Sequence, residues 1–177
     1  MNVIDLLKKD IIRYNPNYTS DKTKLRKISI FITTWISHGG FRAVFFYRIL
    51  RNFYIKDKKY LYNFFKLFEL ILSPIEISVR LKAGHGLLFP HPQCIVIGGG
   101  NLGNNVAIFQ GVTIGLKKNL GEYPTIGDNV QLGAGSKILG NVTIGDNSRT
   151  GANSVVLKDV PQNSVVAGIP ATIIRKN

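Results

Sequence analysis

Apolar residues recur at every sixth position over the second half of the chain. A helix with about 3.6 residues per turn cannot keep such a period on one face, whereas a solenoid that turns a corner at each repeat can. Small or apolar residues form a second inward series, and Gly, Asn or Asp suits the corners. The pattern predicts a parallel β-helix of hexapeptide repeats. The first series is Val96, Leu102, Ile108, Ile114, Ile126, Leu132, Ile138, Ile144, Thr150 and Val156, and the second is Val130, Ser136, Val142, Ser148, Ser154 and Val160.

The repeat is interrupted between Ile114 and Ile126 by a segment that contains adjacent lysines. Leu120 would keep the six-residue phase, so one interpretation is an extra coil. We favour a loop extruded over about residues 116–125, because insertions in solenoids project from one face and commonly carry function.

Apolar residues before residue 74 follow helical spacing instead. The pattern predicts helices over about residues 4–11, before Pro16, over 23–37, over 41–49, and from a cap at Asp57 through Leu72. The chain is therefore expected to divide into an α-helical region, residues 1–74, and a β-helix region, residues 75–177.

The last predicted helix is apolar on most sides, although Lys66 and Glu69 argue against its spanning a membrane. Two interpretations remain open for this helix. We favour burial in an oligomer, and the alternative is a helix that lies on a bilayer surface.

Charge and cysteine content narrow the class of protein. The sequence has 23 Lys and Arg against 10 Asp and Glu, a net charge of +13. Residues 1–82 carry 16 basic and 6 acidic side chains, a net of +10, and residues 83–177 carry 7 and 4, a net of +3. This balance implies an anionic partner.

Cys94 is the single cysteine, which excludes a disulfide framework and a cysteine-based zinc site. The start has no long apolar run, and no transmembrane stretch is apparent, so a cytoplasmic location is expected.

Several motifs of the β-helix region have a recognisable form. Residues 84–92 read GHGLLFPHP, 95–98 IVIG, 110–115 QGVTIG, 126–130 IGDNV, 133–140 GAGSKILG, 151–156 GANSVV and 167–171 AGIPA. Together they resemble the serine O-acetyltransferase family over about residues 75–174. The helical region resembles that family more loosely, around residues 41–50. The resemblance implies a left-handed parallel β-helix, acetyl transfer from acetyl-CoA to a hydroxyl, and a homotrimer with active sites between adjacent solenoids.

A poor nucleophile such as an alcohol needs a base that accepts its proton during attack on a thioester. Histidine suits this role, because its ordinary pKa of about 6.5 leaves it mostly neutral at pH 7. By resemblance, His91 is the catalytic histidine, and Glu76 stands fifteen residues earlier where the family usually has Asp. That carboxylate would orient the imidazole, on a longer arm than Asp provides. The alternative is that His91 is only a corner residue between two prolines.

The resemblance assigns mostly backbone contacts to the co-substrate. Amides of Gly115 and Leu116 would face the oxyanion of the tetrahedral intermediate. Amides of Ala134 and Ala152 would meet the pantetheine arm.

Two basic side chains are candidates for the nucleotide phosphates. Arg149 falls where the family places a lysine, and Lys158 would assist it. The alternative for Arg149 is a solvated corner charge. No metal ion is expected.

The chain departs from serine-specific members at two acceptor positions. Pro90 replaces an Asp before the catalytic histidine, and Tyr123 replaces a His of the loop. Both changes remove groups that would grip the charged ends of an amino acid. We therefore expect a sugar hydroxyl of a surface polysaccharide or its precursor as acceptor, in resemblance to the subgroup that acetylates capsule, O-antigen or exopolysaccharide. Tyr123 would stack on the sugar, and His85 is a secondary acceptor residue; the alternative for Tyr123 is packing on the solenoid.

Two other functions remain open. The chain could be a serine O-acetyltransferase of cysteine biosynthesis, or a scaffold without catalysis. No nucleic-acid partner is expected, since no basic recognition helix or aromatic platform appears. A set of basic side chains in the helical region would hold the protein against an anionic membrane surface; the alternative is a solvated face. The set is Lys8, Lys9, Arg13, Lys22, Lys24, Arg26, Lys27, Arg51, Lys56, Lys58 and Lys59.

Overall fold

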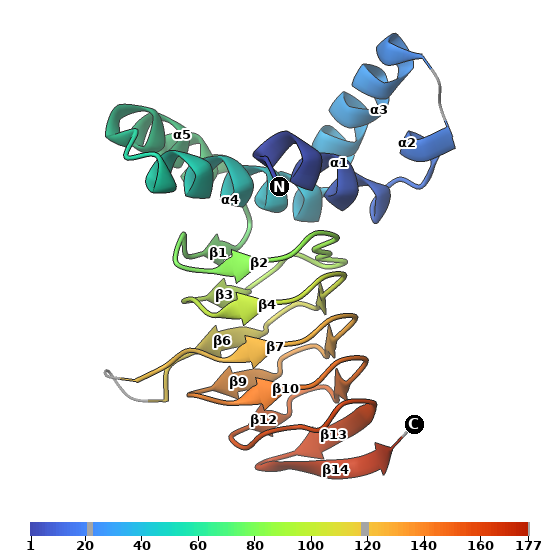
Figure 1. The fold of residues 1–177 in the computed structure, drawn as a ribbon, viewed down its shortest axis with the longest axis vertical. Helices are drawn as coiled ribbons and strands as arrows, with labels where there is room; N and C mark the ends of the chain where they lie inside the picture. The colour runs from blue at the N-terminus through green and yellow to red at the C-terminus, as the bar shows by residue number, and fades with distance from the viewer. Residues whose placement is uncertain (21–22, 118–120, 177) are drawn as a thin grey trace.

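The computed structural model describes residues 1–20, 23–117 and 121–176. Within these residues, helices form one end of the molecule and short strands stack below them in successive coils (Figure 1). The helices are α1 (Val3–Ile12), α2 (Asn17–Ser20), α3 (Lys24–Ser37), α4 (Gly39–Ile55) and α5 (Lys59–Leu72). The strands are β1 (Glu76–Ile77), β2 (Lys82–Ala83), β3 (Val96–Ile97), β4 (Asn101–Leu102), β5 (Ala107–Ile108), β6 (Thr113–Gly115), β7 (Thr125–Ile126), β8 (Gln131–Leu132), β9 (Lys137–Leu139), β10 (Thr143–Ile144), β11 (Arg149–Thr150), β12 (Val155–Val156), β13 (Ser164–Gly168) and β14 (Ala171–Lys176).

The strands build three sheets that form the faces of a prism. Face one has the order β1-β3-β6-β9-β12, face two β10-β7-β4-β2, and face three β14-β13-β11-β8-β5. Pairing is parallel throughout these described strands except for the antiparallel pair β13–β14 at the C-terminal end. The predicted left-handed parallel β-helix with an N-terminal helical region is confirmed.

The residues predicted to point inward form the core of the prism. Both six-residue series are buried, including the hydroxyl-bearing members Ser136, Ser148 and Ser154, with one exception. Val96 is 40% exposed, and its neighbour Ile97 is fully buried instead, in register with Ile77 and Ile114. The prediction for Val96 was wrong because the corner after β3 contains three successive glycines, residues 98–100, and is one residue shorter than the six-residue phase requires.

An asparagine ladder supports one edge of the prism. Asn105, Asn129, Asn147 and Asn163 all have φ of 57° to 58°, in the left-handed region that asparagine tolerates. Their side-chain amides donate to one another from coil to coil over 3.1–3.2 Å. The corner residues inferred from the sequence thus link neighbouring coils as well as turning the chain.

The interruption of the repeat lies in a single corner. Strand β6 of face one pairs directly with β3 and with β9, and β7 follows on face two, so no additional coil separates them. The interpretation as an extra coil was therefore wrong. Leu120, on which it rested, lies outside the described residues.

The helical end differs from the prediction in its last cap and in its surface. Helix α5 begins after Lys58, while Asp57 has a φ of 50° and its carboxylate lies 3.8 Å from Lys59, so the predicted Asp57 cap was wrong.

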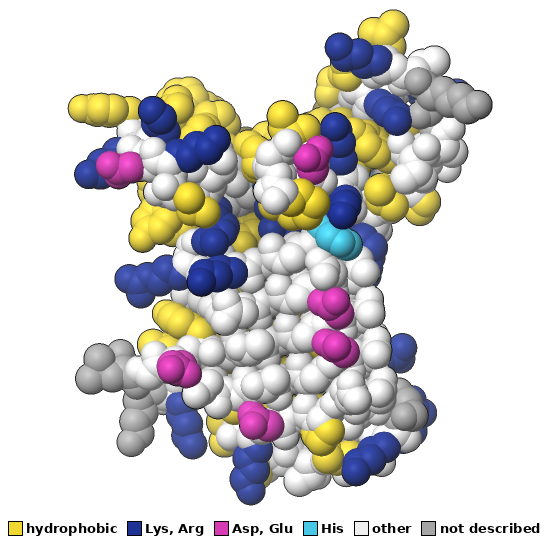
Figure 2. Space-filling model, viewed as in Figure 1, with side chains coloured by type: hydrophobic (Ala, Val, Ile, Leu, Met, Phe, Trp, Pro, Cys, Tyr) yellow, Lys and Arg dark blue, Asp and Glu magenta, His cyan; other side chains and the backbone are white. Residues whose placement is uncertain are grey.

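Most large apolar side chains of α5 are exposed in the single chain, and only Glu69 of this helix is buried. Lys, Arg and hydrophobic side chains gather on the helical end, whereas the solenoid face in view is mostly neutral (Figure 2). None of the described helices has both the length and the apolar character needed to cross a bilayer.

Candidate active site

His91 lines a cavity of about 580 Å³ where the helical end meets the solenoid. The solenoid contributes residues 88–93, and α1, α3 and α4 contribute side chains near their ends. His91 itself is exposed, and its ring lies 6.3 Å from the ring of Phe109 in the coil below. Cavities of this size hold small molecules. The lining residues are Arg13, Tyr14, Ser37, His38, Gly39, Gly40, Arg42, Pro74, Leu88, Phe89, Pro90, His91, Pro92 and Gln93.

The corner that carries His91 continues down the prism between faces three and one. The amide of Gly111 donates to Gln93, that of Gly135 to Gln110, and that of Asn153 to Ala134, over 2.7–2.9 Å. These bonds stack the corners of four successive coils in one row. Ala134 and Ala152, predicted to meet pantetheine, occupy this row below His91, so an extended arm along the corner row would reach the histidine.

Glu76 is placed differently from the resemblance. It is exposed on β1, and its backbone amide donates to Ile95 over 3.0 Å. Within the described part of the chain, its carboxylate makes no hydrogen bond to His91, and it does not line the cavity. The pairing of Glu76 with His91 stays a prediction.

Other predicted residues lie on a second edge, between faces one and two. Gly115 ends β6, and Leu116 follows it at the start of the inserted corner. Lys158 lies in the equivalent corner after β12 and is exposed. Arg149 is exposed on β11 of face three. A single chain therefore brings His91, Ala134 and Ala152 to one edge, and Gly115, Leu116 and Lys158 to another.

The two residues proposed for the acceptor lie away from His91 in the single chain. The ring of Tyr123 packs on the glycine corner: a Cβ added at Gly99 would lie 3.0 Å from it. His85 donates from its backbone amide to the Asn104 side chain over 3.2 Å. Neither residue lines the cavity that contains His91. In the single chain Tyr123 packs on the solenoid, which is the alternative to stacking on an acceptor.

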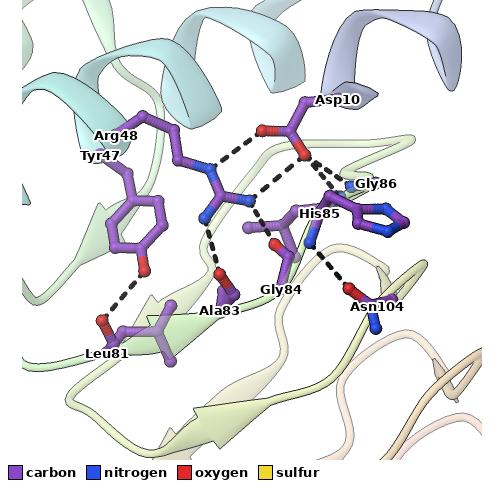
Figure 3. A network of polar contacts seen from close by, with 10 residues as sticks. Asp10, Tyr47, Arg48, Leu81, Ala83, Gly84, His85, Gly86 and Asn104 are labelled. Atoms are coloured by element: carbon purple, nitrogen blue, oxygen red, sulfur yellow. Dashed lines mark hydrogen bonds and ion pairs between the residues drawn. The ribbon is translucent and has the colours of Figure 1, made fainter. Parts of the chain in front are cut away.

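A buried ion pair joins the helices to the segment that leads to His91 (Figure 3). Arg48 of α4 contacts Asp10 of α1 through Nε, at 2.9 Å, and Nη2, at 3.2 Å. Asp10 Oδ1 also accepts from the amides of Gly86, at 2.7 Å, and Leu87, at 3.1 Å. Arg48 donates to the carbonyls of Ala83 and Gly84. One charged pair thereby fixes the backbone of residues 83–87.

Two further contacts set the distance between helices and solenoid. The hydroxyl of Tyr14 accepts from the Phe89 amide over 2.8 Å, and burial raises the pKa of this hydroxyl well above its ordinary range. Gly40 of α4 lies directly against Phe89, since an added Cβ would overlap the Phe89 carbonyl oxygen at 2.2 Å, far inside van der Waals contact.

Sequence reasoning missed Asp10, Arg48, Tyr14 and the arginines of the cavity as parts of the site. A signal existed for the first two, because each is a charge next to apolar residues on a helix, Asp10 beside Ile11 and Arg48 beside Ile49. Their partners lie 35 or more positions away along the chain, which no local pattern shows.

Comparison with known proteins identifies relatives over most of the chain. The family model for bacterial transferase hexapeptide (six repeats) matches residues 123–158. A serine acetyltransferase of Bacillus pumilus is 35% identical over 150 residues, which cover 83% of this chain and 69% of that protein. A serine acetyltransferase of Haemophilus influenzae is 35% identical over 153 residues, covering 85% and 57%.

Solved structures show the same similarity. Soybean serine acetyltransferase complexed with serine has a TM-score of 0.82 and 28% identity, covering 98% of this chain and 70% of that chain. A serine acetyltransferase in complex with CoA has a TM-score of 0.77 and 33% identity, covering 97% and 69%.

The predicted sugar acceptor, and with it a role in polysaccharide biosynthesis, was wrong. The curated relatives and the structural neighbours are serine acetyltransferases, which supports the alternative function. The prediction rested on Pro90 and Tyr123 of the solenoid alone. In the structure the cavity at His91 is also lined by helical residues, which an argument from the solenoid motifs leaves out.

The predicted O-acetyl transfer from acetyl-CoA is confirmed at the level of the family. Identity above 30% over more than two thirds of both proteins accompanies agreement of the whole fold. This chain belongs to the serine acetyltransferase family of hexapeptide-repeat enzymes and is an acetyl-CoA-dependent O-acetyltransferase.

Proposed function

We propose that the chain transfers the acetyl group of acetyl-CoA to the hydroxyl of serine. The supporting observation is the position of His91, in a cavity of about 580 Å³ at the top of the corner row that carries Ala134 and Ala152. A thioester at the end of an arm laid along that row would lie beside the histidine, and an acceptor in the cavity would lie on its other side.

In the proposed reaction each predicted catalytic residue has one role. His91 accepts the hydroxyl proton as the serine oxygen attacks the thioester carbonyl. The amides of Gly115 and Leu116 donate to the oxyanion, and the intermediate collapses with release of CoA as a thiol, which takes the proton from the imidazolium. Glu76 would stabilise the imidazolium, and Arg149 and Lys158 would contact the nucleotide phosphates. His85 and Tyr123 do not line the cavity and have no part in this reaction.

The test of this function is a product assay. Purified protein with acetyl-CoA and L-serine is expected to release CoA thiol and to form O-acetylserine, detected by mass spectrometry. Release of thiol without O-acetylserine would mean transfer of the acetyl group to water or to the serine amine, and would contradict the proposal. No release with any acceptor would support the scaffold alternative.

We also propose that the active form is a cyclic homotrimer, because the predicted site residues lie on two edges of the prism. A trimer brings the edge with Gly115 and Leu116 of one protomer against the edge with His91 of the next. Analytical ultracentrifugation at micromolar concentration is expected to give three times the 19.7 kDa of one chain. A monomeric mass in a fully active preparation would contradict both the trimer and the shared site.

Peripheral membrane association is the remaining proposal. The exposed apolar side chains of α5, such as Phe64 and Ile71, lie on the same helical end as most of the excess positive charge. Each basic residue close to an anionic bilayer contributes about 1 kcal/mol of attraction, which salt screens. Flotation with vesicles is expected to show binding to anionic but not to neutral lipid, and loss of binding at high salt. Absence of binding at low salt would leave the charge as a solvated face.

A further inference from the structure

Two arginines give the cavity at His91 an unbalanced positive charge. Arg13 follows α1 and Arg42 lies in the first turns of α4, and both are half-buried in the cavity wall. The described lining contains no Asp or Glu. Neither arginine forms an ion pair among the residues that the structure describes.

Both guanidinium groups have donors to spare. Arg13 uses Nη1 for one hydrogen bond, 3.1 Å to the Asn105 carbonyl. Arg42 donates Nε to Leu72 and Nη1 to Trp35 and Ile36, and its guanidinium carbon lies 5.9 Å from the centre of the Trp35 ring. Because these partners are neutral carbonyls and a ring, both positive charges stay uncompensated, and Nη2 of each has no partner in the described part of the chain.

The carboxylate of Asp10, in the buried ion pair that joins the helices to the solenoid, already has a counter-charge. Asp10 is fully buried and paired with Arg48, and its remaining lone pairs accept from Gly86 and Leu87. Asp10 is therefore no counter-ion for the cavity, so an anionic ligand would find both arginines without a carboxylate partner among the described residues.

We propose that Arg13 and Arg42 form a carboxylate subsite that holds the acceptor while His91 takes the proton of its hydroxyl. The inference rests on the proposed acetyl transfer and names the substrate class of that site: small hydroxylated carboxylates, with serine as one member. Planar guanidinium groups match the two oxygens of a carboxylate, which fixes the direction of the rest of the molecule. Since the described residues place no carboxylate in the cavity wall, the ammonium of serine finds no charged partner among them.

The subsite explains how a serine acetyltransferase can carry Pro90 and Tyr123. The sequence showed the loss of two charged acceptor contacts on the solenoid, and the helical end supplies a positive pair to the same cavity. Recognition of the carboxylate would thus come from α1 and α4, and the helices would take part in substrate selection.

Variants of Arg13 test the subsite, because Arg13 has fewer structural bonds than Arg42. Arg13→Gln is expected to raise the KM for serine roughly ten- to hundredfold, the range for a lost hydrogen bond to a charged group, with kcat and the KM for acetyl-CoA unchanged. Arg13→Lys should recover part of the affinity because it keeps the charge. Arg51→Gln is the matched control: Arg51 is also half-buried and also donates Nη1 to one backbone carbonyl, that of Val79, but it lies outside the cavity.

Substrate analogues test the same contact from the other side. Serinamide lacks the carboxylate and is expected to lose roughly ten- to hundredfold in kcat/KM on the wild-type protein. 3-Hydroxypropionate lacks the ammonium and should be acetylated with a kcat/KM similar to that of serine. The penalty for serinamide should shrink in Arg13→Gln, since one of the two partners of the carboxylate is then missing.

The outcomes separate the subsite from the reaction. An unchanged KM for serine in both Arg13→Gln and Arg42→Gln, with serinamide as good a substrate as serine, would overturn the subsite and leave serine acetylation standing. A rise in the KM for acetyl-CoA alone would assign the arginines to the CoA phosphates and would also overturn it. Calorimetric binding of serine and 3-hydroxypropionate, weakened by Arg13→Gln in a protein without transferase activity, would support the subsite and contradict the proposed function.

Discussion

Replacement of His91 by alanine is expected to lower kcat by about 10²- to 10⁴-fold, because general-base assistance to an alcohol is of that size. His91 is exposed in the cavity and none of its described contacts ties the fold together, so the variant should keep its melting temperature. Single-turnover kinetics with acetyl-CoA and serine measure the effect.

Two measurements serve as controls for the His91 variant: its affinity for CoA, and the kcat of Glu76→Gln. CoA binding should be nearly unchanged in His91→Ala, since the corner row with Ala134 and Ala152 is untouched. Glu76→Gln should cost much less in kcat, because a carboxylate that orients or stabilises the imidazolium is not itself the base. Turnover of His91→Ala near the wild-type value would remove His91 from the mechanism.

Replacement of Asp10 by asparagine is expected to lower the free energy of unfolding by about 3–5 kcal/mol, the range for breaking a buried ion pair from one side. The side chains of Asp10 and Arg48 are 0% and 2% exposed, so the arginine would be left buried without its counter-charge. Equilibrium denaturation in urea, followed by circular dichroism, measures the loss.

Asp5→Asn is the matched control on the same helix. Asp5 lies 3.8 Å from Lys8 in an exposed pair, and such pairs contribute less than about 1 kcal/mol. A loss in Asp10→Asn no greater than in Asp5→Asn would contradict a stabilising role of the buried pair. The variant should also weaken catalysis more than its stability loss requires, because Asp10 holds the amides of Gly86 and Leu87 on the segment before His91.

The sequence alone determined the solenoid. Its inward positions could be read from a period of six, since each short face carries one inward residue and each coil repeats the same geometry. The same reading failed at Val96, where the three-glycine corner shifts the phase by one residue, and it could not place the insertion after Ile114 without knowing which strands pair. The role of His91 was indicated by motif resemblance, and the choice of acceptor from Pro90 and Tyr123 was wrong because it used local positions only.

Only the tertiary structure decided what surrounds His91. Sequence periodicity describes contacts between residues one coil apart, but the helical end meets the solenoid through contacts such as Asp10 with Gly86 and Tyr14 with Phe89, 76 and 75 positions apart. Such contacts are set by how amphipathic helices dock on the first coil, which depends on shape and on the neutralisation of buried charge. The repeats therefore determined the framework from the sequence, while the cavity, its two arginines and the separation of the predicted site onto two edges of the prism were set by packing across the whole chain.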